Sequence, residues 1–218
     1  MKKSETLLIV HIVVGAALLL LGLLGLDRLV AEYLSDNGYQ RIGFLTAGTH
    51  WLDTVTGKEL SKFLIGLVIS GCGLALLFPF RTRYWGSGAL FVGIVQLLGT
   101  ILSGTSKNIF GRLRPFQVIQ AADWSHQWFS GGSAFPSGHA GFYFGLFLPL
   151  AYLFPVWRWP LLLVAWFIAV ARVNANDHFI SDIGASILLV ALLALLLARP
   201  MNALRCSKPV GLQTGPRK

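Results

Sequence analysis

Long apolar runs alternate with short polar connections along this chain. Six runs stand out, at roughly 7–26, 63–80, 86–105, 137–155, 160–175 and 181–198. Each approaches the length that an α-helix needs to cross ~30 Å of hydrocarbon at about 1.5 Å per residue. Because lipid leaves only helices or closed barrels as spanning structures, the pattern predicts an all-α integral membrane protein, a bundle of six transmembrane helices.

The first run follows Lys2 and Lys3, as the apolar part of a signal peptide would. It continues for about twenty residues, however, and no convincing small-x-small cleavage site follows it. We therefore expect it to be an uncleaved first span.

Composition agrees with a membrane protein. Hydrophobic residues make up 55% of the 218 residues and charged residues 12%, and the mean hydropathy is +0.66. A soluble domain could not hide that much apolar surface. The length suits one domain, 1–218, and no linker is visible.

The net charge of +9 lies at run ends and in the tail, so anionic lipid headgroups are expected partners and nucleic acid is not. No obligate protein partner is indicated.

The cations of alternate connections predict the orientation. The N-terminus, Arg81, Arg83, Arg158 and a basic tail, 199–218, share one side, which the positive-inside tendency makes cytoplasmic. The connections 27–62, 106–136 and 174–180 share the other, extracytoplasmic side. In the first of these, apolar residues recur at helical spacing between charged ones, which predicts short interfacial helices. These residues are Leu29, Val30, Tyr33, Leu34, Trp51, Leu52 and Val55.

The most informative polar residues of the chain lie in the second and third of these outer connections. His178 precedes Asp182 by one helical turn, so the carboxylate can hold one ring nitrogen protonated and leave the other free to attack. Such a pair is typical of a nucleophilic dyad. A helix start capped by Asp177 or Ser181 would be the structural alternative.

Residues 136–139 form a Pro-Ser-Gly-His turn at the start of the fourth run. Pro136 fits the first turn of a helix, where unpaired backbone N–H groups point outward and bind phosphate readily. Gly138 would let the backbone approach an anion, and Ser137 would supply a hydroxyl donor. His139 is then placed to give a proton to a departing oxygen.

Three cations complete the pattern, namely Lys107, Arg114 and Arg172. A phosphoryl group in transfer spreads negative charge over its oxygens, and fixed cations stabilise that charge in a dry site. Arg112 is a weaker candidate, because residues 107–114 also form an ordinary cationic border to the third run. The chain has no Walker A loop, no zinc-ligand spacing and no dinucleotide glycine pattern, so no cofactor is implied.

The three motifs, Lys107-x6-Arg114-Pro115, residues 136–139 and Arg172-x5-His178-x3-Asp182, resemble the signatures of the type 2 phosphatidic acid phosphatase family. The resemblance covers 107–182. It implies a metal-independent membrane phosphatase that works through a phosphohistidine.

Position by position, the resemblance makes His178 the nucleophile, Asp182 its orienting carboxylate and His139 the acid. The phosphate cradle would comprise Lys107, Arg114, Ser137, Gly138 and Arg172. One position departs from the family pattern, because Ala171 stands where a serine commonly precedes the arginine. That departure removes one supporting hydrogen bond and no step of the chemistry.

The expected function is hydrolysis of a lipid phosphate monoester or diphosphate at the extracytoplasmic surface of a bacterial cytoplasmic membrane. Phosphatidylglycerophosphate, phosphatidic acid, undecaprenyl diphosphate and lipid A phosphates remain open as substrates. Two alternatives also remain, a lipid phosphotransferase with the same intermediate and a non-catalytic protein that binds anionic lipid. Oligomeric state is not indicated by the sequence.

Overall fold

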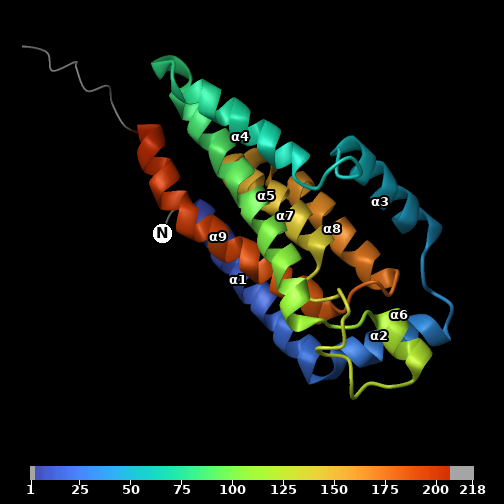
Figure 1. The fold of residues 1–218 in the computed structure, drawn as a ribbon. Coiled ribbons are helices and arrows are strands. Elements are labelled where there is room, and N and C mark those ends of the chain that lie inside the picture. Colours follow the sequence, from blue (N-terminus) through green and yellow to red (C-terminus); the bar gives the residue numbers. More distant parts are fainter. Residues whose placement is uncertain (1–2, 207–218) are drawn as a thin grey trace, which may run out of the picture.

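The computed structural model describes residues 3–206, and these residues form helices and connections without any strand. The all-α class is therefore confirmed for the described part of the chain (Figure 1). Most of the predicted basic tail, 207–218, lies outside it. The helices are α1 (Lys3–Leu21), α2 (Asp27–Asp36), α3 (Gly43–Val55), α4 (Leu64–Leu77), α5 (Arg83–Phe110), α6 (Pro115–Ala121), α7 (Gly138–Leu153), α8 (Arg158–Asn174) and α9 (Ile180–Cys206).

A helix forms at each of the six apolar runs, but their lengths differ. Among the described residues, four helical segments are long and apolar enough to cross a membrane, Glu5–Asp36, Arg83–Ala121, Pro155–Asn174 and Ile180–Leu204. The helices at the second and fourth runs, α4 and α7, have only 14 and 16 residues. Length and composition therefore support four spans, and the count of six stays a prediction.

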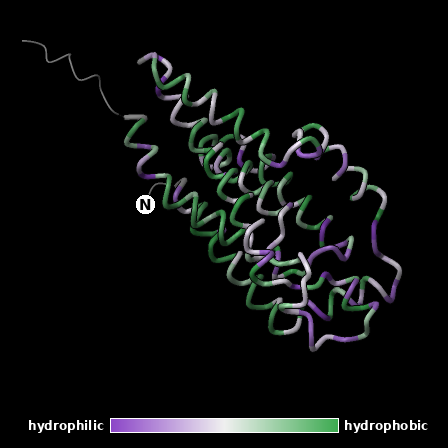
Figure 2. The backbone as a smooth tube through the Cα atoms, in the orientation of Figure 1, coloured by the Kyte–Doolittle hydropathy of each residue, from purple (hydrophilic) through white to green (hydrophobic). Residues whose placement is uncertain are grey.

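Helix α7 is the centre of the bundle. It packs against α1, α5, α8 and α9, and the side chains of Phe142, Tyr143, Phe144 and Leu148 are fully buried. A helix that is apolar on all sides, as α7 is, is typical of a buried position. Apolar residues follow the long helices, whereas polar residues gather at one end of the molecule (Figure 2).

Helices α1 and α9 lie side by side because glycine lets their backbones approach. A Cβ at Gly184 would lie 2.4 Å from the backbone nitrogen of Leu19, which is too close for any side chain. After α1 the chain kinks over Gly22–Leu26, where Gly25 takes a φ of 142°. That φ suits glycine, and the kink leads the chain into α2.

The connections that carry the three motifs lie together at the polar end, beside α2 and α6 (Figure 1). Backbone hydrogen bonds join them, from Phe116 N to Asn176 O at 3.2 Å and from Ser137 N to Asp182 O at 3.1 Å. The first connection contains helices α2 and α3, as predicted, while their interfacial position stays a prediction. Helix α6 was not anticipated.

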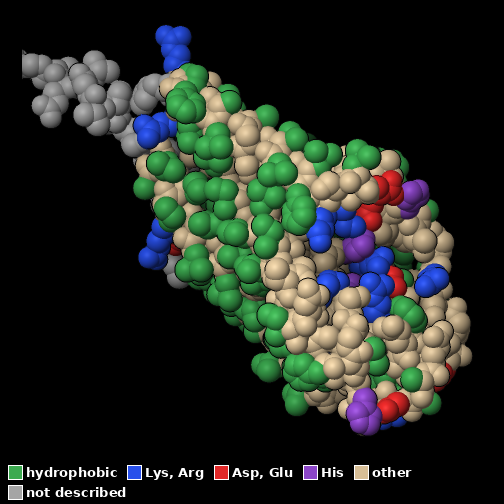
Figure 3. Space-filling model, viewed as in Figure 1, with side chains coloured by type: hydrophobic (Ala, Val, Ile, Leu, Met, Phe, Trp, Pro, Cys, Tyr) green, Lys and Arg blue, Asp and Glu red, His purple; other side chains and the backbone are tan. Residues whose placement is uncertain are grey.

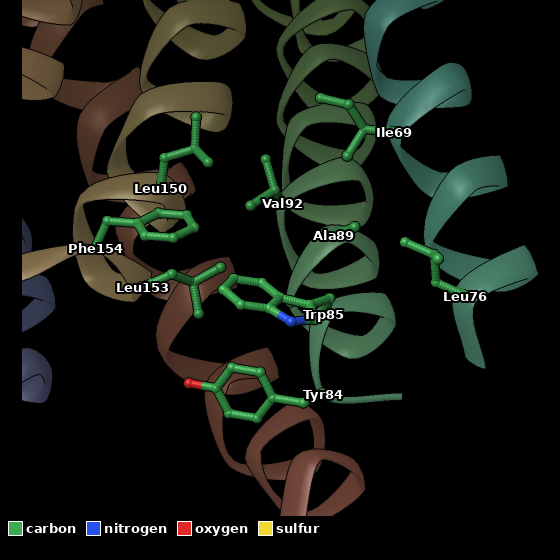
Figure 4. A pocket seen from close by; sticks show the side chains of 10 residues that line it. Ile69, Leu76, Tyr84, Trp85, Ala89, Val92, Leu150, Leu153 and Phe154 are labelled. Atoms are coloured by element: carbon green, nitrogen blue, oxygen red, sulfur yellow. The ribbon is translucent and has the colours of Figure 1, made fainter. Parts of the chain in front are cut away.

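The opposite end of the bundle contains an apolar cavity of about 350 Å³ (Figure 4). It lies between α4, α5 and the end of α7, and residues such as Ile69, Val92 and Phe154 line it. None of the residues of the three motifs contributes to this cavity. It is therefore separate from the candidate site.

Candidate active site

The structure brings the three motifs to one surface. Lysine, arginine, acidic and histidine side chains gather around a hollow at the polar end, while the long flank beside it is mostly apolar (Figure 3). Lys107 comes from the last turn of α5 and Arg114 precedes α6. His139 lies in the first turn of α7, Arg172 in the last turn of α8, and His178 in the connection before α9.

The ring of His178 is held in one orientation. The residue is only 2% exposed, and its Nδ1 lies 2.9 Å from the carbonyl oxygen of Ala134. A carbonyl can only accept, so Nδ1 carries the proton and Nε2 keeps its lone pair. Burial lowers the pKa of His178. A neutral imidazole with a free Nε2 is the form that can act as a nucleophile.

Asp182 lies beside the His178 ring, as the spacing predicted, but its contact with the ring is longer than that of Ala134. Its Oδ2 lies 3.6 Å from Nδ1, beyond a normal hydrogen bond, and instead accepts from the backbone nitrogen of Phe179 at 2.8 Å. The direct hydrogen bond of the ring goes to Ala134. Asp182 still contributes a nearby negative charge and fixes the backbone around His178.

Arg112 is buried and is paired with carboxylates of the protein. It is 1% exposed, and its guanidinium lies between the rings of Trp128 and Phe179, at 4.3 and 4.0 Å from their centroids. Nη1 donates to Asp182 at 2.7 Å and Nη2 donates to Asp27 at 2.8 Å. The guanidinium is therefore occupied by carboxylates of the protein. No motif of the sequence pointed to Asp27 as a partner of Arg112.

Lys107 and Arg114 meet at Ser133, in the connection before α7. Lys107 Nζ donates to the carbonyl of Ser133 at 2.6 Å, and Arg114 Nη2 donates to its hydroxyl at 3.4 Å. A Cβ at Gly138 would lie 3.8 Å from Lys107 Nζ, so the ammonium lies against the start of α7. The positive charges of Lys107 and Arg172 both act on His178. These cations therefore lie around the same imidazole.

Asp177 bridges the two arginines of the predicted cradle. Its carboxylate lies 2.7 Å from Nη2 of Arg172 and 3.6 Å from Nη1 of Arg114. Nε of Arg172 is buried and has no hydrogen-bond partner among the described residues. One side of that guanidinium is thus fixed by the protein, while its Nε has no partner among the described residues. The sequence had indicated Asp177 only as a possible helix cap.

Ser137 and Gly138 form the start of α7, as the turn predicted. Ser137 is fully buried, and its Oγ accepts a hydrogen bond from the backbone nitrogen of Ala140 at 3.3 Å. This is the capping role that favours serine before a helix. A contact of Ser137 or Gly138 with phosphate stays a prediction.

His139 has partners that sequence reasoning missed. Its Nε2 lies 3.0 Å from Oδ2 of Asp53 and 2.5 Å from Nζ of Lys58, both from the first connection. More than eighty residues separate them from His139 in the chain. The only signal was the mixture of acids and lysines in that connection, which could not show which of them turns inward.

A polar cavity of about 290 Å³ adjoins this cluster. It lies between α3 and the last turn of α8, so it opens beside the charged groups of the site (Figure 3). Its lining residues are Arg41, Thr46, Thr49, His50, Asp53, Ala171, Arg172, Ala175 and Asp177. Ala171, the departure from the family pattern, therefore borders this cavity without adding a polar group.

The fold and the site together define a helical protein with membrane-length segments and a histidine site surrounded by cations. The chain belongs to the PAP2 superfamily, whose family model matches residues 88–206, more than half of the chain and all three motifs. Members of this superfamily are phosphatases, which supports a phosphoric ester hydrolase in general. No curated protein and no solved structure matched the chain.

Proposed function

We propose that this protein is a metal-independent lipid phosphatase that works through a phosphohistidine on His178. The observation that carries the proposal is the state of the His178 ring. Ala134 holds the proton on Nδ1, burial keeps the ring neutral, and the charges of Lys107 and Arg172 act on it. A neutral imidazole on which two cations act fits attack on an anionic phosphorus centre.

In the first step, Nε2 of His178 would attack the phosphorus atom while the bond to the leaving oxygen breaks. His139 would give its proton to that oxygen, so the lipid leaves as a neutral hydroxyl. Lys107, Arg114 and Arg172 would stabilise the charge on the equatorial oxygens. The guanidinium of Arg172, whose side chain is 17% exposed, would provide donors for this purpose.

In the second step, water would attack the phosphohistidine and the phosphorus–nitrogen bond would break. His139, now unprotonated, would take a proton from that water. Inorganic phosphate leaves, and both histidines return to their starting states. A lipid hydroxyl in place of water would make the same site a phosphotransferase, so the product decides between the two.

Two apolar hollows beside the polar cavity support a lipid as the substrate. Helix α3 turns Thr49 and Asp53 toward the polar cavity, while Trp51 and Leu52 line an apolar hollow of about 680 Å³ against α8. A second hollow of about 410 Å³ is next to the first, and Leu45, Trp166 and Val170 line both. A molecule with a phosphate head and an apolar chain would match both surfaces.

We place the site at the extracytoplasmic surface, with all six helices of the apolar runs crossing the membrane. The positive-inside tendency supports this orientation, because the cations near Arg81 and Arg158 lie at the end away from the site. The N- and C-termini would then be cytoplasmic. In a bacterium the substrate would be reached from the outer leaflet of the cytoplasmic membrane.

The test uses purified protein in detergent with EDTA, supplied with the four lipid phosphates that the sequence leaves open. Wild type should release inorganic phosphate from at least one of them, and His178→Gln should release none while folding normally. Activity of His178→Gln close to wild type would refute the mechanism. No release from any lipid, with normal lipid binding, would favour the non-catalytic alternative.

A second variant tests the acid. His139→Ala should slow lipid hydrolysis by roughly 10²–10⁴-fold, the usual range for general acid catalysis. The loss should be smaller with p-nitrophenyl phosphate, because its leaving group departs without a proton. Equal losses on the two substrates would contradict the acid role of His139.

A further inference from the structure

The first connection supplies a charged pair to His139. Oδ2 of Asp53 lies 3.0 Å from Nε2 of His139 and accepts a hydrogen bond from Lys58 Nζ at 2.9 Å. Its other oxygen accepts from the hydroxyl of Tyr143 at 2.7 Å. Both oxygens are therefore engaged, and the carboxylate has a fixed position at the end of α3.

The Asp53 carboxylate remains charged in this position. Burial would raise the pKa of Asp53, but hydrogen bonds from His139, Lys58 and Tyr143 hold it well below its usual range. Burial also lowers the pKa of Lys58. The side chains of Asp53 and Lys58 are only 14% and 13% exposed, so solvent screens their charges weakly.

The contact between Lys58 and His139 limits how protons are shared. Nζ and Nε2 are 2.5 Å apart, and only one hydrogen can lie between two nitrogens at that distance. The carboxylate of Asp53 favours a proton on the imidazole, whereas the ammonium of Lys58 opposes it. Arg172, from α8, is the other charge that acts on the ring.

We propose that Asp53 and Lys58 together control the protonation state of the His139 ring. This proposal rests on the proposed phosphatase function. Asp53 is a positioning residue that fixes the ring and stabilises its imidazolium form, and Lys58 counteracts that effect through its charge. Neither residue belongs to the three motifs. The pair therefore makes the first connection part of the catalytic site.

His139 gives up a proton in the first step and takes one back in the second. As the bond from phosphorus to the leaving oxygen breaks, the proton moves from His139 to that oxygen, and Asp53 stays ionised throughout. When water attacks the intermediate, the proton of the water returns to His139 beside the same carboxylate. Asp53 thus stabilises the charged ring before the first proton transfer and after the second.

Two substitutions with opposite expected effects test the pair. The fall of kcat/KM at high pH reports deprotonation of the acid. Asp53→Asn should move that fall to lower pH and Lys58→Met should move it to higher pH, each by about one unit or more for a charge at this distance. Glu32→Gln is the matched control, because Glu32 lies in α2 and forms an exposed ion pair with Arg28. Its profile should equal that of wild type.

An NMR titration of the histidine rings gives a readout that does not require turnover. The purified protein would be labelled with ¹³C-histidine, and His139→Gln would assign the signal. The His139 midpoint should fall in Asp53→Asn and rise in Lys58→Met. Shifts of the same sign in both variants, no shift in either, or an equal shift in Glu32→Gln would overturn the proposal. If one variant does not fold, the absence of the expected shift in the other is enough to overturn it.

The two proposals fail in different ways. If wild type releases no phosphate but the two titrations move in opposite directions, the pair is supported and the phosphatase function is wrong. If wild type is active and the midpoints do not move, the phosphatase stands and the role of Asp53 and Lys58 is wrong.

Discussion

Arg112 and Asp182 form a buried ion pair, with Nη1 and Oδ1 separated by 2.7 Å. The other oxygen of Asp182 holds the backbone of Phe179, next to the nucleophile His178. Arg112 also binds Asp27 at 2.8 Å. This single guanidinium therefore ties the kink after α1 to the segment that carries His178.

Loss of Arg112 should destabilise the protein strongly. Arg112→Met would leave two buried carboxylates without their cation, a change that typically costs about 3–5 kcal/mol. Thermal unfolding in detergent measures the effect. The control Arg28→Met breaks an exposed pair with Glu32 and should change stability by about 1 kcal/mol or less. Unchanged stability of Arg112→Met with lost vanadate inhibition would instead make Arg112 a ligand for phosphate.

Arg114 and Arg172 should not tolerate lysine. Each guanidinium can keep its contact with Asp177 and still direct a donor at a phosphoryl oxygen, whereas an ammonium is a single point charge. Arg114→Lys and Arg172→Lys should each lower turnover by on the order of 10²-fold or more. Vanadate, which mimics the transferring phosphoryl group, should also lose potency in both.

The exposed Arg28→Lys is the control for these exchanges and should keep the turnover of wild type. Near-normal turnover and vanadate inhibition in both site variants would show that the two arginines only anchor the bundle in the membrane interface.

The sequence allowed prediction of those parts of the site that depend on local spacing. The helix start at Ser137 and Gly138, and the placement of His178 one turn before Asp182, follow from four-residue patterns. The hydrogen-bond partner of His178 could not be predicted, because it is the backbone carbonyl of Ala134. A residue of any type at position 134 would supply the same carbonyl. The sequence likewise indicates nothing about which distant charges turn inward.

Contacts between residues far apart in the sequence also explain why other parts of the site were not predicted. Asp27 reaches Arg112 across 85 residues, and Asp53 reaches His139 across 86. In the sequence both acids stand among charges of either sign and look like solvated loop residues. The six apolar runs did become helices, but the sequence did not show that α7 would lie at the centre of the bundle, because the helices packed around it come from distant parts of the chain.

The pH dependence of catalysis should reflect the buried state of His178. The nucleophile must be unprotonated, so kcat/KM should rise with pH as His178 loses its proton. Burial lowers the pKa of His178 from its ordinary value of 6.5, so the midpoint of this rise should lie below pH 6.5. A pH profile of phosphate release measures it. A rise centred above pH 6.5 would contradict a buried neutral imidazole.

The two ends of the bundle should face opposite sides of the membrane. In a variant with Cys72 and Cys206 replaced by serine, Asp123→Cys should react with an impermeant thiol reagent added outside intact cells. Arg81→Cys, at the other end, should react only after the membrane is opened. The Asp123 side chain is 47% exposed, so access should not limit its labelling. Labelling of Arg81→Cys alone from outside would invert the proposed orientation.

Trapping the covalent intermediate tests the phosphohistidine most directly. Wild-type protein mixed with a ³²P-labelled lipid substrate would be quenched in alkali within milliseconds, because phosphohistidine survives base and is lost in acid. The label should lie on the peptide that contains His178 and should be absent from His178→Gln. Turnover without any labelled peptide, or with the label on another residue, would contradict His178 as the nucleophile.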